Sequence, residues 1–328
     1  MTSRVAFAVA LALLFLAAAG FRFMTLATGF TNDHFLHLAG AQQMLFGEWP
    51  TKDFLDPGLP LMYAASALAQ LLLGRTLFAE GILVTLAFGL AAVMTAAAVR
   101  ELTGSRVLAL IAAVIEIAIV PRAYGYPKIL LYATTFFLLQ RYVTRPTTGR
   151  LLALAVSIAV AFLFRHDHGI YLGVGAVLAA FLVHESEPLR ERARRAATCA
   201  GLTALLVAPY LVYVQIYGGL WSYMRVGLAF RAAELGRQSF AWPTLLGERP
   251  HEAALYYGYW MLPIAALLLV LAHRRREDGG SNLARVVPIC AVALLVNSSF
   301  LRDPLTGRLQ DAIVPAVTLG SWMTFVAW

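Results

Sequence analysis

The sequence predicts an all-α, polytopic membrane protein. Of the 328 residues, 60% are hydrophobic and only 13% are charged, and the mean hydropathy is +0.72. A soluble domain is charged at about a quarter of its residues, so this chain has too few polar side chains to cover a water-soluble globule. Apolar runs of the length that spans a bilayer recur throughout, which predicts about 9–10 transmembrane helices in one transmembrane domain, residues 1–328. A disordered or a disulfide-stapled secreted protein is excluded.

The positive charge follows the pattern of membrane topology rather than of a nucleic-acid surface. The formal net charge is +8, yet of the 26 basic residues only Lys52 and Lys128 are lysines, and the arginines lie mostly in short loops between apolar runs. That distribution is typical of the positive-inside rule, and we expect no nucleic-acid partner. Cys199 and Cys290 both fall inside apolar runs, so neither a disulfide framework nor a thiolate metal site follows from them.

The first apolar run covers residues 5–24 and follows Arg4. Small residues at 16–20 also fit the cleavage region of a signal peptide. A retained first helix is favoured because many further spans follow it. Under either reading, the next segment lies outside the cytoplasm.

Further apolar runs predict the remaining spans. The last run begins near residue 312 and stops at Trp328 without a C-terminal flank, so we expect the chain to be C-terminally truncated. The intervening runs cover residues 77–99, 107–120, 129–143, 151–164, 170–183, 196–216, 253–272 and 286–300.

Arginine-rich loops set the expected orientation. Positive-inside logic assigns Arg4 and four arginine-bearing loops to the cytoplasm, which makes the chain a multi-pass protein of a bacterial-type inner (plasma) membrane. The four loops carry Arg100 and Arg106; Arg141, Arg145 and Arg150; Arg190, Arg192, Arg194 and Arg195; and Arg274, Arg275 and Arg276.

This orientation leaves two large segments on the outer face, residues 25–79 and 217–249. The first contains an apolar stretch, residues 59–73, that is too short to span comfortably. Counting it as a span would place every later arginine cluster outside, so we expect an interfacial helix there. The second segment is rich in Tyr and Trp, as interfacial segments often are.

A helix is expected to begin at Thr31-Asn32-Asp33, with Thr31 or Asn32 as its N-cap, and to run to about Phe46. Asp33 and His37 are four residues apart and therefore share a helix face. Asp33, at the mouth of the first span, is a candidate general base. The structural alternative is that Asp33 only stabilises the positive end of the helix.

The following loop carries a more specific pattern. Residues 41–50 read A-x-x-M-x-x-G-x-W-P, then come Asp53-Phe54 and a P-L-x-Y sequence at 60–63. An acid after the first span followed by this pattern resembles the first outer loop of GT-C glycosyltransferases, and the closest resemblance is to the family 39 and ArnT-like (protein mannosyltransferase-like) branch. The resemblance covers roughly residues 4–171 in order and spacing.

The resemblance implies an integral membrane glycosyltransferase whose active site faces the periplasm or exterior. Such enzymes move a hexosyl or pentosyl group from a polyprenyl-phosphate donor to a lipid, glycan or protein acceptor. Asp33 would then be the catalytic carboxylate. Two departures are visible: the neighbours of Asp33 are Asn32 and His34 rather than a second acid, and residues 55–58 read Leu-Asp-Pro-Gly where related enzymes often carry a lysine for the donor phosphate.

Cationic residues at the next outer turns offer a replacement for that lysine. Arg122 and Lys128 flank the turn at 121–128, where they are suited to bind a phosphate at the membrane surface; alternatively, both only snorkel to the interface. The Arg165-His166-Asp167-His168 sequence lies between two apolar runs, where polar residues are costly unless they pair or line a cavity. We expect Arg165 to bind sugar or phosphate and Asp167 to hold an arginine or a histidine, with His168 beside them.

An acid inside a span completes the candidate set. Glu116 is expected to face the bundle or a cavity, where it partners Arg122 or Lys128, forms a structural ion pair, or acts as a second acid. His34, His37, His166 and His168 all fall on the predicted outer face, where a divalent metal site is conceivable; their spacing is not specific, and no metal or other cofactor is expected. Four arginines of the second outer segment are candidates for contacts with donor phosphate, an anionic acceptor or membrane lipids: Arg225, Arg231, Arg237 and Arg249.

Two other classes of protein remain open from the sequence. A polytopic transporter or flippase for lipid-linked sugars, without transferase activity, would use Glu116 and the 165–168 cluster as a translocation path. No internal repeat of the kind common in transporters is visible. A non-catalytic scaffold resembling a glycosyltransferase is the third reading.

Overall fold

A computed structural model describes residues 3–26, 30, 32–236, 242–246, 248–274, 281–301 and 305–328. Thr31, Arg237, Arg275 and Arg276, named above as candidates, lie outside these residues. The side chains of Arg4, Arg231 and Arg274 also lie outside the description.

The described chain is helical, and each apolar run predicted above coincides with a helix. The helices are α1 (Ser3–Thr25), α2 (Asn32–Leu45), α3 (Pro60–Leu73), α4 (Leu77–Thr103), α5 (Arg106–Ala118), η2 (Ala123–Gly125), α6 (Tyr126–Thr144), α7 (Thr148–Phe164), α8 (His166–Leu182), α9 (Leu189–Tyr217), α10 (Leu220–Gly236), α11 (Pro250–Arg274), α12 (Ser281–Asn297), η3 (Ser298–Leu301), α13 (Leu305–Asp311) and α14 (Ile313–Ala327).

Five of these helices are long and apolar enough, by length and composition, to cross a membrane. They comprise Val5–Thr25, Leu77–Thr103, Leu189–Tyr217, Pro250–His273 and Asn282–Leu301. Shorter apolar helices, such as Thr148–Phe164 and Ile313–Ala327, lie among them. The described chain is therefore an all-α, membrane-embedded protein, as the composition predicts.

Local sequence signals explain where several helices begin and end. The side chains of Thr76 and Ser105 accept hydrogen bonds from the backbone at the starts of α4 and α5, which satisfies donors that a helix start leaves unpaired. Gly104 ends α4 in the left-handed conformation, with φ of 74°, which glycine adopts without steric cost. Pro60 lies in the first turn of α3, where its missing N–H costs nothing.

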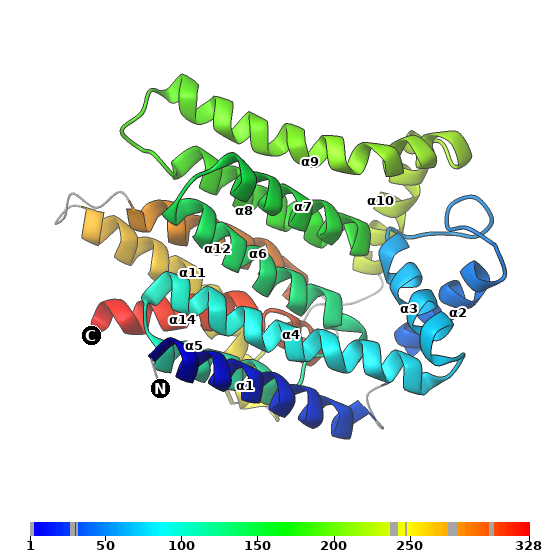
Figure 1. Ribbon diagram of the computed structural model, residues 1–328, viewed down its shortest axis with the longest axis horizontal. Coiled ribbons are helices and arrows are strands. Elements are labelled where there is room, and N and C mark those ends of the chain that lie inside the picture. Colours follow the sequence, from blue (N-terminus) through cyan, green and yellow to red (C-terminus); the bar gives the residue numbers. More distant parts are fainter. Residues whose placement is uncertain are drawn as a thin grey trace.

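The helices form one bundle with α4 near its centre. α4 packs against α1, α5 and α6, while α8 packs against α7 and α12, and α9 lies over α7 and α8 (Figure 1). The main core includes Tyr132, Phe136 and Trp322, all nearly inaccessible to solvent. A smaller cluster around Leu154 and Cys199 joins α6, α7, α8 and α9.

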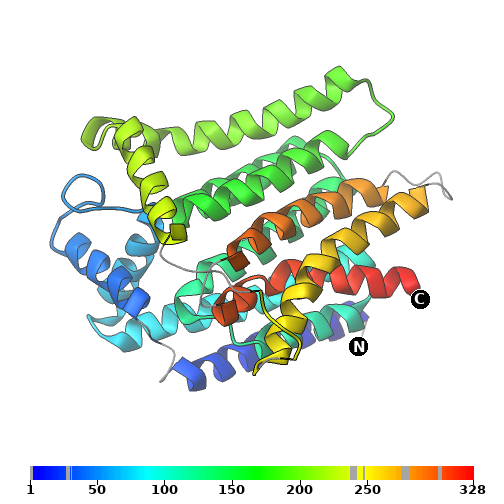
Figure 2. The ribbon, with the colours of Figure 1, turned by 180° about the vertical axis from the view of Figure 1, so that it is seen from behind.

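The two ends of the bundle differ in character. The N-terminus and the connections α4–α5, α6–α7 and α8–α9, which carry the arginine clusters, lie at one end (Figures 1 and 2). Helices α2, α3 and α10 gather at the opposite end. The arginine loops thus share one side of the molecule, as the orientation argument requires.

Candidate functional site

Asp33 lies in the first turn of α2, at the end of the bundle opposite the arginine loops, and its side chain is exposed. Tyr124, in the η2 turn, lies within electrostatic range of the Asp33 carboxylate. Burial raises the pKa of Tyr124 to about 12, so its hydroxyl is protonated at neutral pH. The Asp33 carboxylate is therefore exposed and lies near a buried phenol.

His37 follows Asp33 by one helical turn and is half-buried. Its ring lies against Tyr124, with ring centroids 6.0 Å apart, and against Tyr63 at 6.3 Å. Burial lowers the pKa of His37 to about 4; the cations Arg165 and Lys128 also lower it, and Asp33 raises it. His37 is consequently neutral at pH 7, and it lies within electrostatic range of both the acid and the cations.

Arg122 and Lys128 converge on one buried carboxylate that the sequence reasoning did not single out. Asp311 Oδ2 accepts from Lys128 Nζ at 2.6 Å and from Arg122 Nη2 at 2.5 Å. Both cations also lie over the ring of Tyr124, at 4.8 Å for Arg122 and 5.7 Å for Lys128. Tyr124 thus lies against both cations and within electrostatic range of Asp33.

Asp311 ends α13, directly before the last apolar helix. Burial alone raises the pKa of its carboxyl, but Lys128 and Arg122 lower the pKa by more, so that it falls to about 2. The carboxyl group is therefore ionised at neutral pH. Gly125 gives it room, because a Cβ there would lie 3.0 Å from Asp311 Oδ1. The sequence does contain a signal for Asp311, because this acid directly precedes an apolar run. Asp33 is a candidate for the same kind of reason.

Arg165, Asp167 and His168 form a second cluster at the α7–α8 junction. Arg165 donates two hydrogen bonds to the Asp167 carboxylate, at 3.0 and 2.7 Å. The backbone N–H of His168 donates to the same carboxylate at 2.9 Å, and the His168 ring hydrogen-bonds the buried Tyr132 hydroxyl. Asp167 therefore holds both an arginine and a histidine, which is the arrangement expected from the sequence.

Glu116 does not partner Arg122 or Lys128, which corrects one expectation. Both cations pair with Asp311 instead. Glu116 is almost fully buried in α5 beside Thr95, and its Oε2 atom has no hydrogen-bond partner. The sequence places Glu116 a few residues from the turn, but the helix directs it into the bundle.

The other outer histidines have separate partners. His34 hydrogen-bonds the buried Glu80 at 2.8 Å, while His166 stacks on Phe162 and contacts the Tyr223 hydroxyl at 3.1 Å. Among the residues described, no group of three or more His, Cys, Asp or Glu side chains is placed to hold a metal ion.

Asp56 takes a structural role in the loop between α2 and α3. Its Oδ1 accepts from the backbone N–H groups of Gly58 and Leu59, both at 2.8 Å. Its Oδ2 accepts from the Tyr210 hydroxyl at 3.0 Å, and Tyr210 in turn contacts the Tyr223 hydroxyl at 3.0 Å. This network ties the first outer loop to α9 and α10.

The later outer arginines lie apart from these clusters in the described residues. Arg225 is exposed on α10, and Arg249 is exposed and pairs with Glu252 at 3.3 Å. Neither has a contact that links it to Asp33.

Taken together, the structure brings an exposed carboxylate and several cations to one end of the bundle. His37 lies within electrostatic range of Asp33, Lys128 and Arg165. Tyr124 lies within range of Asp33 and has Arg122 and Lys128 over its ring. Such an arrangement can accept a proton at the carboxylate and stabilise a phosphate at the cations. No protein-family model matches the chain, and a search of curated proteins finds no match.

Proposed function

We propose that the chain is a membrane glycosyltransferase that moves a sugar from a polyprenyl-phosphate donor to a lipid, glycan or protein acceptor on the outer face of the membrane. The observation that supports the proposal is that the exposed Asp33 and the Arg122–Lys128 pair both lie within range of one residue, Tyr124. The resemblance of the first outer loop to GT-C enzymes points to the same chemistry.

In the proposed reaction, Asp33 accepts the proton of an acceptor hydroxyl or amine. The freed electron pair attacks the anomeric carbon, and the bond from that carbon to the phosphate oxygen breaks. The polyprenyl phosphate leaves with the bonding electrons, and negative charge grows on the phosphate. Because the attack comes from the face opposite the leaving group, the configuration at the anomeric carbon is inverted. Preorganised cations at that position lower the barrier because they interact more strongly with the leaving group than with the substrate.

The cations retain donors for such a phosphate. Arginine has five N–H donors and lysine three, whereas Arg122 and Lys128 each use one on Asp311. The buried Nε of Arg122 has no hydrogen-bond partner. Asp311 holds the pair in place, and the remaining donors are available to an incoming anion.

The decisive experiment replaces Asp33 by Asn in the full chain. We expect Asp33→Asn to lower sugar transfer by about 10²–10⁴-fold, the usual contribution of a general base, because the amide cannot take the acceptor proton. The measurement is transfer of a radiolabelled sugar from polyprenyl-phosphate donors in proteoliposomes, with the thermal unfolding midpoint as the folding check.

Glu48→Gln is the matched control, since Glu48 is an exposed acid of the same outer segment. Its activity should equal that of the parent chain. Full transfer by Asp33→Asn would remove Asp33 from the mechanism. Flux of a lipid-linked sugar across the vesicle membrane without any transfer would replace the proposal by the transporter reading.

A further inference from the structure

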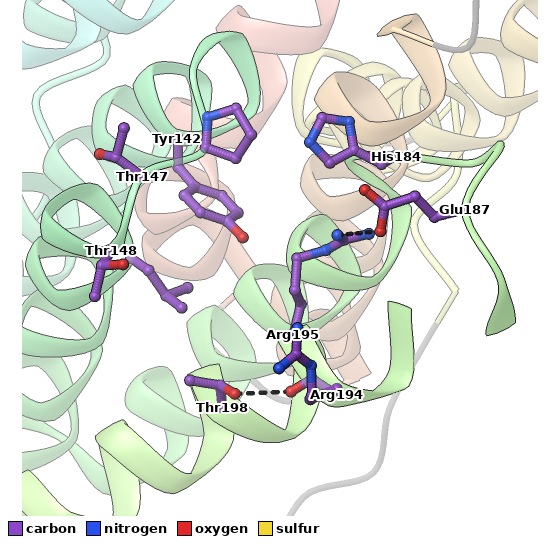
Figure 3. Close-up of a pocket in the computed structure, with 10 residues that line it drawn as sticks. Tyr142, Thr147, Thr148, His184, Glu187, Arg194, Arg195 and Thr198 are labelled. Carbon is purple, nitrogen blue, oxygen red and sulfur yellow. Dashed lines mark hydrogen bonds and ion pairs between the residues drawn. The ribbon is translucent and has the colours of Figure 1, made fainter. Parts of the chain in front are cut away.

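A cavity lies at the arginine-rich end of the bundle, far from Asp33. It has a volume of about 360 Å³ and lies between the α6–α7 corner and the α8–α9 corner. Tyr142, Thr147 and Thr148 line one side, while His184, Glu187 and Arg195 line the other (Figure 3). Leu151 and the small apolar cluster around Cys199 lie at its base. Polar side chains therefore line the sides of the cavity, and packed apolar side chains lie beneath them.

Its cationic lining has free hydrogen-bond donors. Arg195 is mostly buried and uses Nη1 to pair with Glu187, whereas its Nε and Nη2 atoms are buried and have no hydrogen-bond partner. A buried unpaired donor costs about 1–3 kcal/mol, so a ligand that accepts from these atoms would recover that cost. Arg194 adds a second positive charge to the lining.

The opposite side of the cavity contributes further donors. Thr147 is the N-cap of α7 and Thr148 is its first residue. The first N–H groups of a helix have no partner within the helix and carry partial positive charge. The Tyr142 hydroxyl points toward the middle of the cavity (Figure 3). Thr147 Oγ1 accepts from the Arg150 N–H, so the Tyr142 hydroxyl and the N–H groups of the first turn that precede Arg150 are the donors left on this side of the cavity.

We propose that this cavity binds a phosphate-bearing anion, and that its source is the headgroup of an anionic phospholipid. Arginine's planar fork suits phosphate oxygens, and helix N-termini bind the same group. The surrounding loops also carry Arg145, Arg150 and Arg192, a concentration that attracts anionic lipids at a membrane surface. Glu187 opposes an anion, but its pairing with Arg195 holds the guanidinium in place.

The test measures ligand binding to the purified full chain in detergent by native mass spectrometry. The probes are dioctanoyl phosphatidic acid, dioctanoyl phosphatidylcholine and inorganic phosphate. We expect phosphatidic acid to bind and phosphatidylcholine to bind at least tenfold more weakly. If inorganic phosphate binds as tightly as phosphatidic acid, the anion chemistry stands and the source is a soluble phosphate; if it binds more weakly, the source is the lipid.

Two variants should change the affinity of the cavity for phosphatidic acid in opposite directions. Arg195→Gln should weaken phosphatidic acid binding about tenfold or more, because it removes a charge and the free donors. Glu187→Gln should tighten binding severalfold, because among the described residues of the lining Glu187 is the acid. Arg190→Gln is the control, since it removes one arginine of the same end that is exposed and does not line the cavity.

Thermal unfolding shows whether Arg195→Gln folds. If this variant does not fold, the proposal can still be tested. In that case Glu187→Gln decides, because only an anion site gains affinity when the acid is neutralised. Absence of phosphatidic acid binding, an equal loss in Arg195→Gln and Arg190→Gln, or unchanged or weaker binding by Glu187→Gln would overturn the proposal.

Discussion

Asp311 is the residue on which the candidate site depends most directly. Its carboxylate is the partner of both Arg122 and Lys128 in the described structure. Lys128 is almost fully buried, with 3% of its side chain exposed, and a buried cation without a counter-ion is strongly unfavourable. The Asp311 carboxylate therefore decides whether the two cations can remain where they are.

Replacing Asp311 by Asn should destabilise the protein by about 3–5 kcal/mol, the typical cost of removing one partner of a buried ion pair. Thermal unfolding of the purified chain in detergent measures the change. Asp53→Asn is the control, because Asp53 pairs with Lys52 at 3.5 Å on the surface, where an ion pair contributes about 0–1 kcal/mol. Equal shifts for the two variants would contradict a central role of Asp311.

The same carboxylate predicts how stability depends on pH. The pKa of Asp311 is lowered from 3.8 to about 2 in the folded protein, so its contribution is complete above pH 4. As the pH falls from about 4 toward 2, the unfolded state gains a proton before the folded state does, and the contribution is lost. Unfolding midpoints of the parent chain and Asp311→Asn should therefore converge over this range; a constant difference down to pH 2 would argue against the pairing.

The sequence predicts the individual residues of the candidate site better than their partners. Charged groups at the ends of apolar runs are costly unless they pair or line a cavity. This argument selects Asp33, Lys128, Arg122 and Arg165. The pairing of Lys128 with Asp311 spans 183 positions in the chain, and no local pattern encodes such a contact. Of the alternatives open for Glu116, its pairing with these cations is not found, while its burial in the bundle agrees with the expectation from the sequence.

At the level of elements, the tight turn between α7 and α8 brings the Arg165–His168 cluster to the end of the bundle opposite the arginine loops. Gly169 makes this possible, because a Cβ there would lie 2.2 Å from the Phe162 Cα atom and 2.4 Å from its backbone nitrogen. Backbone atoms cannot move aside as a flexible side chain would. The close approach of the two helices therefore requires a residue without a Cβ at this position.

Gly169→Ala should lower stability by at least about 1–3 kcal/mol, the usual cost of overpacking, and should reduce sugar transfer because Arg165 and His168 shift. Gly173→Ala is the control on the same helix, where a Cβ would lie 3.5 Å from the Ile158 Cγ2 atom, an ordinary contact. Its unfolding midpoint should change little. Similar midpoints for both variants would show that the helices separate without cost.

Helix positions followed well from the sequence because they depend on local properties. The helix predicted from about residue 31 to Phe46 is α2, Asn32–Leu45, and the apolar segment at 59–73 forms the short helix α3, Pro60–Leu73. The network of Asp56, Tyr210 and Tyr223 was not predicted, because hydroxyl groups on distant helices meet only through tertiary packing. Whether α3 lies in the membrane interface stays a prediction.

For the whole molecule, the unequal distribution of charge predicts a fixed orientation in the membrane. The arginine-bearing connections share one end of the bundle, and α2, α3 and α10 share the other (Figures 1 and 2). Translocating clustered arginines is unfavourable, so we expect the arginine end in the cytoplasm.

Cysteine labelling of intact cells tests this orientation. Glu48→Cys, at the α2–α3 end, should react with a membrane-impermeant maleimide, whereas Ser186→Cys, in the α8–α9 connection, should react only after the cells are permeabilised. Both positions are exposed, and the native Cys199 and Cys290 are buried, so background labelling is low. The reverse labelling pattern would invert the topology and place Asp33 in the cytoplasm.

The Asp311 pairing also bears on the order in which the protein is made. Arg122 and Lys128 leave the ribosome long before the acid that neutralises them, with α7 to α12 synthesised in between. During that interval the two cations have to stay hydrated or pair elsewhere, so the α5–α6 turn cannot settle into its final position. Completion of the proposed donor site around Arg122 and Lys128 thus waits for the arrival of α13, and a nascent chain stalled before residue 305 would carry its helices without Asp311.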